Sequence, residues 1–214
     1  MSIQHHPADE ILAGFAAGTL DQGRHIVAAT HLAHCAACRA HAAAMEHVGG
    51  EMLAALPPSS ISAGASSKVA ALLDRAVTPA LPEPASGLAD VPGLPSFVRR
   101  MPAAGWAWVA PGLHVRRLSV GPASPSRVFL LRSRPGARFL RHRHTDFEMT
   151  CVLAGSFSHD GARYAAGDLD VGTPDIEHAI EIGLEGPCIS IVAMQGELKL
   201  SGVLGRFLQP LMRL

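Results

Sequence analysis

The stretch His31-Leu-Ala-His-Cys-Ala-Ala-Cys38 lies inside an alanine-rich run that contains neither glycine nor proline between Arg24 and Val48. Such a run predicts helix, and residues four or three positions apart emerge on one face of a helix. His31, Cys35 and Cys38 have this spacing, and imidazole and thiolate are the ligands that Zn²⁺ prefers in sites with about four donors. The stretch therefore predicts a zinc site carried by helices.

The fourth ligand has to come from elsewhere, and our candidate is His6. Pro7 holds the residue before it in an extended conformation and is itself well placed at the start of a helix. The spacing leaves open His34 in place of His31 and His5 in place of His6. A competing interpretation is an alanine-rich helix with two packed thiols, because free cysteine is often buried for packing alone. A redox C-x-x-C motif would need a βαβ context, which the helical surroundings do not provide.

Around this stretch, the first 80 residues predict a small all-α bundle. Apolar residues recur at helical spacing in four segments, which are residues 7–20, 21–33, 36–56 and 67–77. Helices this rich in alanine approach closely but bury few large side chains. A structural metal would therefore contribute to the stability of this domain.

The composition changes after residue 80. Residues 81–95 belong to a proline-rich stretch and predict a semi-rigid linker. Between residues 96 and 195, short apolar runs bounded by glycine and proline predict the strands of an all-β domain. Trp106 and Trp108 alternate with Ala107 and should share a core-facing side. Residues 196–214 carry an apolar stripe at helical spacing and predict an amphipathic helix.

Charge narrows the classes of function. The chain has no formal net charge, and residues 1–80 carry four lysines and arginines and six acids. The net charge of this part is therefore negative, which argues against a domain that binds the phosphates of nucleic acid. Ten arginines between Arg99 and Arg143 precede ten acids between Asp146 and Glu197, which predicts opposite charges paired across strands. No leader and no membrane-length apolar run is seen, so we expect a cytoplasmic protein.

A second set of metal-ligand residues lies in the predicted β domain, with the spacing G-x5-H-x-H-x3-E-x6-G. Its members are Gly136, His142, His144, Glu148 and Gly155. Residues two or four apart on a strand point the same way, and two imidazoles with a carboxylate can bind a metal. His178, which follows Pro174, offers a further imidazole. An H-x-H pair alone on a strand is more often incidental.

The other two cysteines are weaker candidates. Cys151 is an odd number of positions from Glu148 and should face away from the metal, and Cys188 is expected to be a packed core thiol or a redox reporter near it. Four cysteines placed this way do not resemble a disulfide framework.

The stretches from Gly136 to Gly155 and from Gly167 to His178 resemble the two cupin motifs. The first match is complete, whereas Ile176 and Ile182 stand where the second motif usually has glycine and often asparagine. The resemblance implies a small antiparallel β-barrel. It also implies four metal ligands for a divalent ion, which are His142, His144, Glu148 and His178. We expect zinc there, with manganese, iron and nickel as alternatives.

The helical module with His6 and His31-x3-Cys35-x2-Cys38 is similar to the zinc-binding anti-sigma domain. Its fusion to a cupin domain resembles the ChrR family of anti-sigma factors. This resemblance implies a structural zinc and a 1:1 complex with an extracytoplasmic-function-type sigma factor, carried by residues 1–80. It also implies a bend near residues 33–35, and release under singlet-oxygen-type stress sensed with help from the cupin domain. Independently of the resemblance, the acidity of the module and a ligand spacing unlike the C-x2-C…H-x3-H zinc finger argue against direct binding of DNA, and the absence of a long apolar run argues against a membrane partner.

An alternative is a metal-dependent cupin enzyme of the dioxygenase or isomerase type with a zinc-stabilised helical partner domain. The second cupin motif is degenerate, which argues against catalysis more than against metal binding.

Overall fold

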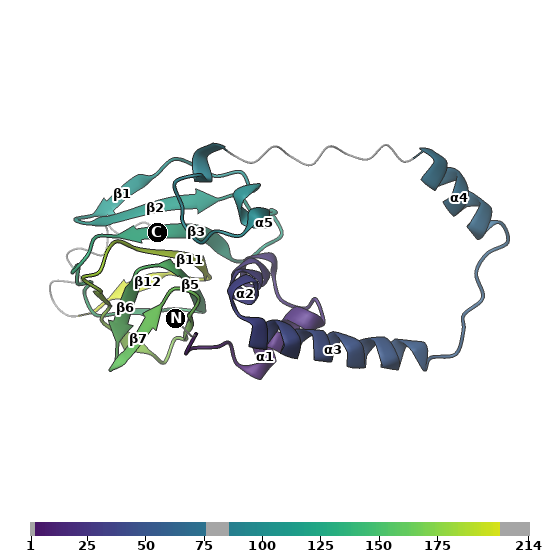
Figure 1. Cartoon of the computed structure of the whole chain (residues 1–214), viewed down its shortest axis with the longest axis horizontal. Helices are drawn as coiled ribbons and strands as arrows, with labels where there is room; N and C mark the ends of the chain where they lie inside the picture. Colours follow the sequence, from purple (N-terminus) through teal and green to yellow (C-terminus); the bar gives the residue numbers. More distant parts are fainter. Residues whose placement is uncertain (1–2, 76–85, 202–214) are drawn as a thin grey trace.

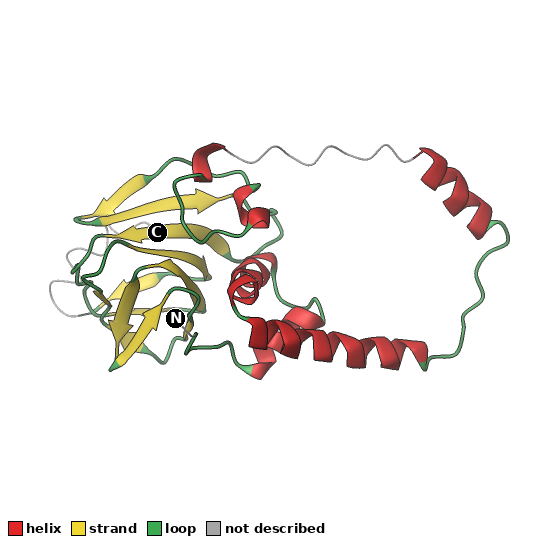
Figure 2. Cartoon of the chain, viewed as in Figure 1, coloured by secondary structure: helices red, strands yellow, loops and turns green. Residues whose placement is uncertain are grey.

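The structure is a computed structural model, and it describes residues 3–75 and 86–201. Four helices come first, followed by a short 3₁₀ turn, a short helix and then strands, as Figures 1 and 2 show. The helices are α1 (Asp9–Ala16), α2 (Gln22–His34), α3 (Ala36–Ala54), α4 (Ala65–Arg75) and α5 (Ser96–Arg99), and the 3₁₀ turn η1 is Ser86–Leu88.

Twelve strands follow in the described part of the chain, and all of their pairings are antiparallel. They are β1 (Ala107–Ala110), β2 (Leu113–Leu118), β3 (Arg127–Ser133), β4 (His142–His144), β5 (Glu148–Ala154), β6 (Ser156–His159), β7 (Ala162–Ala165), β8 (Leu169–Gly172), β9 (Glu177–His178), β10 (Glu181–Ile182), β11 (Cys188–Met194) and β12 (Leu198–Leu200).

The strands form three sheets. One has the order β1-β2-β3-β11-β5-β8, and the two smaller ones have the orders β10-β6-β7 and β12-β4-β9. The predicted fold class, helices followed by antiparallel β-structure of cupin type, is confirmed, although the sheets do not close into one continuous barrel. The predicted charge pairing also occurs, because Arg143 lies opposite Glu177 and Arg138 Nε lies 3.4 Å from a Glu181 carboxylate oxygen.

The predicted bend between the second and third helices is present at Cys35. This residue has extended backbone angles of φ −104° and ψ 106°, and it separates α2 from α3. Asp21 begins α2 as its N-cap, accepting hydrogen bonds from the backbone N–H groups of Gly23 and Arg24. At the α3 N-terminus the Cys35 sulfur accepts from the N–H of Cys38 at 3.4 Å.

Helix α2 packs directly on the β domain, which we define as residues 86–201. Figure 1 shows α2 against the large sheet, where it contacts β5 and β11. Ile26 and Val27 belong to the same buried apolar cluster as Leu130 and Met149 of the sheet. Gly23 permits this approach, because a Cβ atom there would lie 2.5 Å from the Cβ of Ser126.

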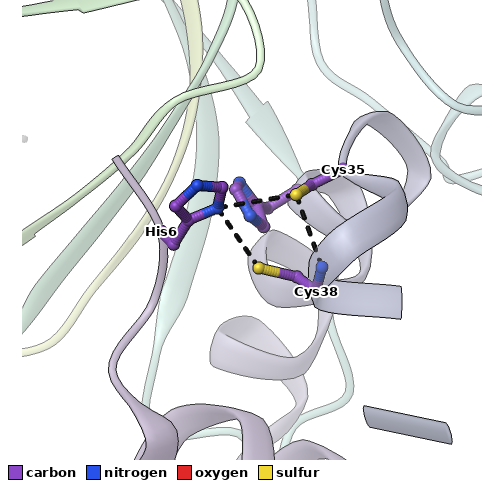
Figure 3. A group of neighbouring side chains, drawn as sticks. His6, Cys35 and Cys38 are labelled. Atoms are coloured by element: carbon purple, nitrogen blue, oxygen red, sulfur yellow. Dashed lines mark hydrogen bonds between the residues drawn. The ribbon is translucent and has the colours of Figure 1, made fainter. Parts of the chain in front are cut away.

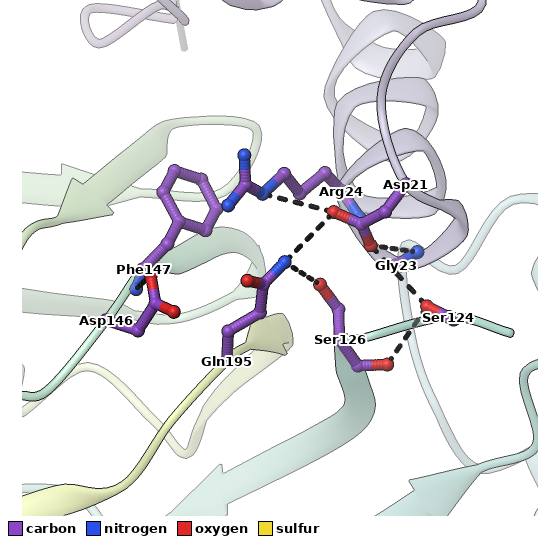
Figure 4. Close-up of polar contacts among 8 residues, drawn as sticks. All are labelled: Asp21, Gly23, Arg24, Ser124, Ser126, Asp146, Phe147 and Gln195. Atoms are coloured by element: carbon purple, nitrogen blue, oxygen red, sulfur yellow. Dashed lines mark hydrogen bonds and ion pairs between the residues drawn. The ribbon is translucent and has the colours of Figure 1, made fainter.

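Polar contacts close the same interface at the start of α2 (Figure 4). The side-chain amide of Gln195 donates to Asp21 at 3.3 Å and to the hydroxyl of Ser126 at 3.1 Å. The Arg24 guanidinium carbon lies 4.0 Å from the centre of the Phe147 ring, a cation–π distance. The first part of the chain is thus held on the β domain by both apolar and polar contacts.

The helices themselves enclose only a small core. Its buried members are Leu12, Leu32, Cys35, Cys38 and Ala42. The second half of α3 is exposed, and no residue of α4 is buried. Figure 1 shows α4 standing away from the other helices and from the sheets. The prediction that four helices pack together therefore holds for α1, α2 and α3 and is wrong for α4.

Part of the predicted linker is instead packed against the sheets. Leu88, Val91 and Leu94 are buried in the same cluster as the core of the large sheet. The Arg99 guanidinium donates hydrogen bonds to the backbone carbonyls of all three residues. The predicted linker, residues 81–95, thus extends too far toward the C terminus, since residues 88–94 are part of the β domain.

Two further expectations are corrected. Residues 198–200 of the predicted C-terminal helix form strand β12, which pairs with β4, while residues 202–214 lie outside the described residues. Trp108 is 66% exposed rather than buried. Trp106 packs partly against the core, and its indole N–H donates to the Asp90 carboxylate at 2.9 Å.

Among the described helices, none has the length and apolar character needed to cross a bilayer.

Candidate metal centres

Four side chains from the start of the chain converge on one point, and we call them the His₂Cys₂ cluster: His6, His31, Cys35 and Cys38. Each offers one ligand atom, and these atoms all lie within 4.8 Å of one another. His6 Nδ1 lies 3.5 Å from the sulfur of Cys35 and 3.3 Å from that of Cys38 (Figure 3). The bend at Cys35 allows the last turn of α2 and the first turn of α3 to face the same point.

The chemistry of this cluster fits Zn²⁺. His31 Nδ1 lies 2.8 Å from the carbonyl oxygen of Gly167, and a carbonyl only accepts, so Nδ1 carries the proton and Nε2 presents a lone pair. Nε2 is buried without a hydrogen-bond partner among the described residues. Burial, together with neighbouring Cys35, raises the pKa of the Cys38 thiol to about 12, so a thiolate here needs a cation.

The two alternatives left open by spacing are resolved by where the side chains point. His5 turns toward the β domain, where its ring lies 4.2 Å from that of Tyr164 and its Nε2 lies 3.0 Å from the carbonyl oxygen of Arg163. His34 Nε2 lies 2.9 Å from the Gly93 carbonyl oxygen. Neither belongs to the His₂Cys₂ cluster.

Residues of the β domain hold two of the four candidate ligands in place. Gly167 accepts from His31, as described above. The Asp168 carboxylate accepts from the backbone N–H groups of Gln4 at 2.7 Å and His5 at 3.0 Å, which positions the segment that carries His6. The sequence alone did not indicate this role of Asp168. Its one signal there is an acidic residue inside the second cupin motif, and the structure shows that this residue is buried.

Replacing Asp168 by alanine is expected to lower the zinc affinity of the His₂Cys₂ cluster about 10- to 100-fold, the usual cost of losing a group that orients a ligand. Co²⁺ in place of Zn²⁺ measures this selectively, since only a site with cysteines gives thiolate-to-metal absorption. The control is Asp175→Ala, which removes an exposed acid of the same domain. An Asp168→Ala protein with unchanged Co²⁺ affinity would contradict the assigned role.

The second group, which we call the histidine cluster, consists of His142, His144 and His178. Their ligand atoms lie within 4.8 Å of one another, and all three side chains are buried. Register explains the convergence, because His142 lies directly opposite His178 across β4 and β9. The Nε2 atoms of these two residues are 3.1 Å apart.

The histidine cluster is set up to bind a cation as neutral imidazoles. Burial lowers the pKa of all three side chains, that of His178 to about 4. His142 donates through Nδ1 to the Leu140 carbonyl at 2.9 Å, leaving Nε2 as the ligand atom. Both ring nitrogens of His144 are buried without a hydrogen-bond partner among the described residues. A divalent metal in the cluster would satisfy one nitrogen of each ring.

Glu148, the fourth predicted ligand, lies at the side of the histidine cluster. Its Oε2 lies 3.3 Å from His144 Nε2, within the distance of an ion pair. The hydroxyl of Thr150 donates a hydrogen bond to its Oε1 at 3.2 Å. Burial raises the pKa of Glu148 to about 7. The structure therefore groups three of the four predicted side chains tightly and places the carboxylate next to one of them.

Sequence reasoning missed a neighbouring pair, His159 and Asp170. His159 Nε2 lies 3.0 Å from Asp170 Oδ2, and the His159 ring is 4.9 Å from that of His178. The hydrogen bond that His159 donates to the Asp170 carboxylate raises the pKa of His159. The available signal was strand alternation, which places His159 on the same side of β6 as Phe157.

A cavity of about 730 Å³ opens beside the histidine cluster. Its lining combines residues of the large sheet with residues of both smaller sheets, so it lies between them. Most of the lining is apolar, and polar groups include His142, Glu148 and Asp170. Cys188 also lines it, whereas Cys151 is buried in the cluster that receives α2.

The fold and the two clusters define a cupin-type protein with an N-terminal helical module and two groups of candidate metal ligands. Residues 95–196 match the model of the ChrR cupin-like domain family. The chain is 33% identical to the anti-sigma-E factor ChrR of Cereibacter sphaeroides over 218 residues, covering 100% of both chains. The chain therefore belongs to the ChrR family of anti-sigma factors.

A solved structure supports the same relationship. The chain is similar to the crystal structure of Rhodobacter sphaeroides SigE in complex with the anti-sigma ChrR, with a TM-score of 0.73 and 32% identity. The match covers 91% of this chain and 100% of that chain. The likeness therefore extends over the helices as well as over the β domain.

Proposed function

We propose that this chain is an anti-sigma factor that binds an extracytoplasmic-function-type sigma factor as a 1:1 complex. In that complex it blocks access of the sigma factor to RNA polymerase and promoter DNA in the cytoplasm. The observation that carries the proposal is the full-length similarity to an anti-sigma factor, including a relative solved in complex with its sigma factor. The alternative of a cupin enzyme has no such support, since that relative is a regulator.

The surface that we assign to the sigma factor, called the surface of α3 and α4, is the exposed apolar side of these two helices and of the segment that joins them. It comprises Val48, Met52, Leu53, Leu56, Ile61, Val69, Leu72 and Leu73, all exposed. Exposed apolar residues concentrated in this way mark interaction sites. The mild acidity of the first 80 residues suits a partner whose surface is basic because it binds nucleic acid, and argues against direct binding of DNA by this chain.

We assign a structural zinc to the His₂Cys₂ cluster, because four donors leave no open position on the ion. A second divalent metal belongs to the histidine cluster, with Glu148 as its carboxylate; zinc is our first choice, and manganese, iron and nickel are the alternatives. Imidazole and carboxylate bind all four ions, so these ligands do not determine which of the four metals is bound.

Release of the sigma factor is proposed to follow oxidative stress of the singlet-oxygen type, sensed with help from the β domain. A physical connection exists for such a signal. Asp168 and Gly167 touch the segments that carry the His₂Cys₂ ligands, and Asp170, two residues later, is bonded to His159 beside His178. A shift of β8 would therefore reach both metal clusters.

The test uses the purified full-length complex and a photosensitising dye illuminated in oxygenated buffer. Labelled sigma factor reports dissociation by fluorescence anisotropy. The His144→Gln protein is expected to lose one of two metal ions per chain, to bind the sigma factor normally in the dark, and to release it at least tenfold more slowly on illumination. Release of the sigma factor from this protein at the wild-type rate would contradict sensing by the β domain.

A further inference from the structure

A third group of metal-ligand side chains lies beside the histidine cluster and shares one member with it. The group consists of His159, Asp170 and His178, whose ligand atoms lie within 4.8 Å of one another. The four ligands that the cupin motifs imply include neither His159 nor Asp170. The chemistry of this pair is therefore not accounted for by the site already described.

The spacing of His159 and Asp170 is compatible with a shared ion. Nε2 of His159 lies 3.0 Å from Oδ2 of Asp170. Two atoms that bind one ion at about 2.0–2.2 Å lie about 3.0–3.4 Å apart when the angle at the ion is octahedral or tetrahedral. A hydrogen bond has the same length, so this pair alone does not distinguish a metal site from an ion pair.

The observation that favours a metal is the environment of His178. Its Nε2 lies 3.1 Å from Nε2 of His142 and so belongs to the histidine cluster. Its Nδ1 is buried and has no hydrogen-bond partner among the described residues. An ion in the histidine cluster satisfies one nitrogen of this ring, and the second nitrogen remains available as a ligand for another ion.

His159 is held in place as metal-binding histidines usually are. Its ring stacks on that of Tyr164, with the ring centres 5.0 Å apart, and its Nδ1 lies 3.3 Å from Oδ2 of Asp160. A carboxylate bonded to the other ring nitrogen of a ligating histidine fixes the orientation of the ring. Asp170 lines the cavity, which offers an entry path for an ion.

We propose that His159, Asp170 and His178 bind a second divalent ion in the β domain, next to the ion of the histidine cluster and linked to it through the imidazole of His178. Two imidazoles and a carboxylate suit Zn²⁺, and three protein ligands leave one position open to water or a small ligand. The site should bind Zn²⁺ more weakly than the two sites with four donors and fill only in an excess of metal. This ion goes beyond the proposed function, because binding of the sigma factor does not require it.

The experiment counts zinc ions in the full-length chain without a sigma factor, so its failure is distinguishable from failure of the anti-sigma activity. Atomic absorption is measured before and after dialysis against an excess of Zn²⁺. We expect wild-type protein to hold two ions per chain as purified and three after dialysis. After dialysis, Asp170→Asn and His159→Phe are each expected to hold two ions, and the phenylalanine preserves a ring beside Tyr164. The control is Asp175→Asn, which alters an exposed acid of the same domain and should hold three.

A double variant separates a site of its own from mere support of the histidine cluster. After dialysis, His144→Gln is expected to hold two ions and His144→Gln combined with Asp170→Asn only one. If Asp170 served only the histidine cluster, the double variant would hold as many ions as His144→Gln alone. The proposal is overturned by that result, or by a wild-type protein that still holds two ions after dialysis, a count that does not depend on how any variant folds.

Discussion

Replacing Cys35 or Cys38 by alanine is expected to remove zinc and sigma-factor binding together. The core that α1, α2 and α3 share consists of a few side chains, two of which are the cysteines themselves. Structural zinc contributes about 10–16 kcal/mol of binding free energy in small metal-dependent domains, far more than such a core supplies. Loss of the ion should therefore loosen the helices and weaken sigma-factor binding by about 100-fold or more.

Zinc content by atomic absorption and affinity by titration with the purified sigma factor measure the two effects on the same preparation. The matched control is Cys188→Ser, which alters a buried cysteine of the β domain that is next to Ser190 and outside the His₂Cys₂ cluster. A Cys35→Ala protein that has lost one zinc yet binds the sigma factor with wild-type affinity would refute a structural role for the ion.

Substituting aspartate for Leu72 is expected to abolish tight sigma-factor binding and to leave the fold unchanged. Leu72 is 66% exposed and shares one face of α4 with Val69 and Leu73, so an aspartate there disturbs no core. In a docked complex the same carboxylate would be buried. Central apolar contacts of an interface are worth about 2–4 kcal/mol, which corresponds to roughly 30- to 1,000-fold in affinity.

The control for Leu72→Asp is Leu184→Asp, since Leu184 is 85% exposed on the β domain and lies outside the assigned surface. Both proteins should unfold in urea within about 0.5 kcal/mol of wild type, as surface substitutions do. Loss of affinity in both variants to the same degree would show that the surface of α3 and α4 is not the specific docking site.

Local patterns in the sequence predict most of the secondary structure. The spacing of His31, Cys35 and Cys38 predicts that three side chains face one point, and the structure brings them together with His6. The alternation of His142 and His144 likewise predicts their shared orientation. Ligation of metal by these residues stays a prediction that metal analysis has to test.

Long-range packing is what the sequence does not reveal. Leu88, Val91 and Leu94 are buried, but their proline- and glycine-rich neighbours make the segment resemble a free linker. Residues 198–200 form a strand because β4 offers an edge to pair with, which outweighs the helical spacing of their apolar side chains. His159 and Asp170 become neighbours only when the small sheet that contains β6 packs against the large sheet that contains β8.

The approach of α2 to the large sheet limits how this protein can be recombined with its relatives. Its surface against β5 and β11 is complementary to one particular sheet, down to the missing side chain of Gly23 beside Ser126. In a chimaera that joins the helices of this chain to another cupin domain, α2 would pack poorly against the foreign sheet. Exchange of β domains should succeed only when residues 21–34 are exchanged together with the strands that they cover.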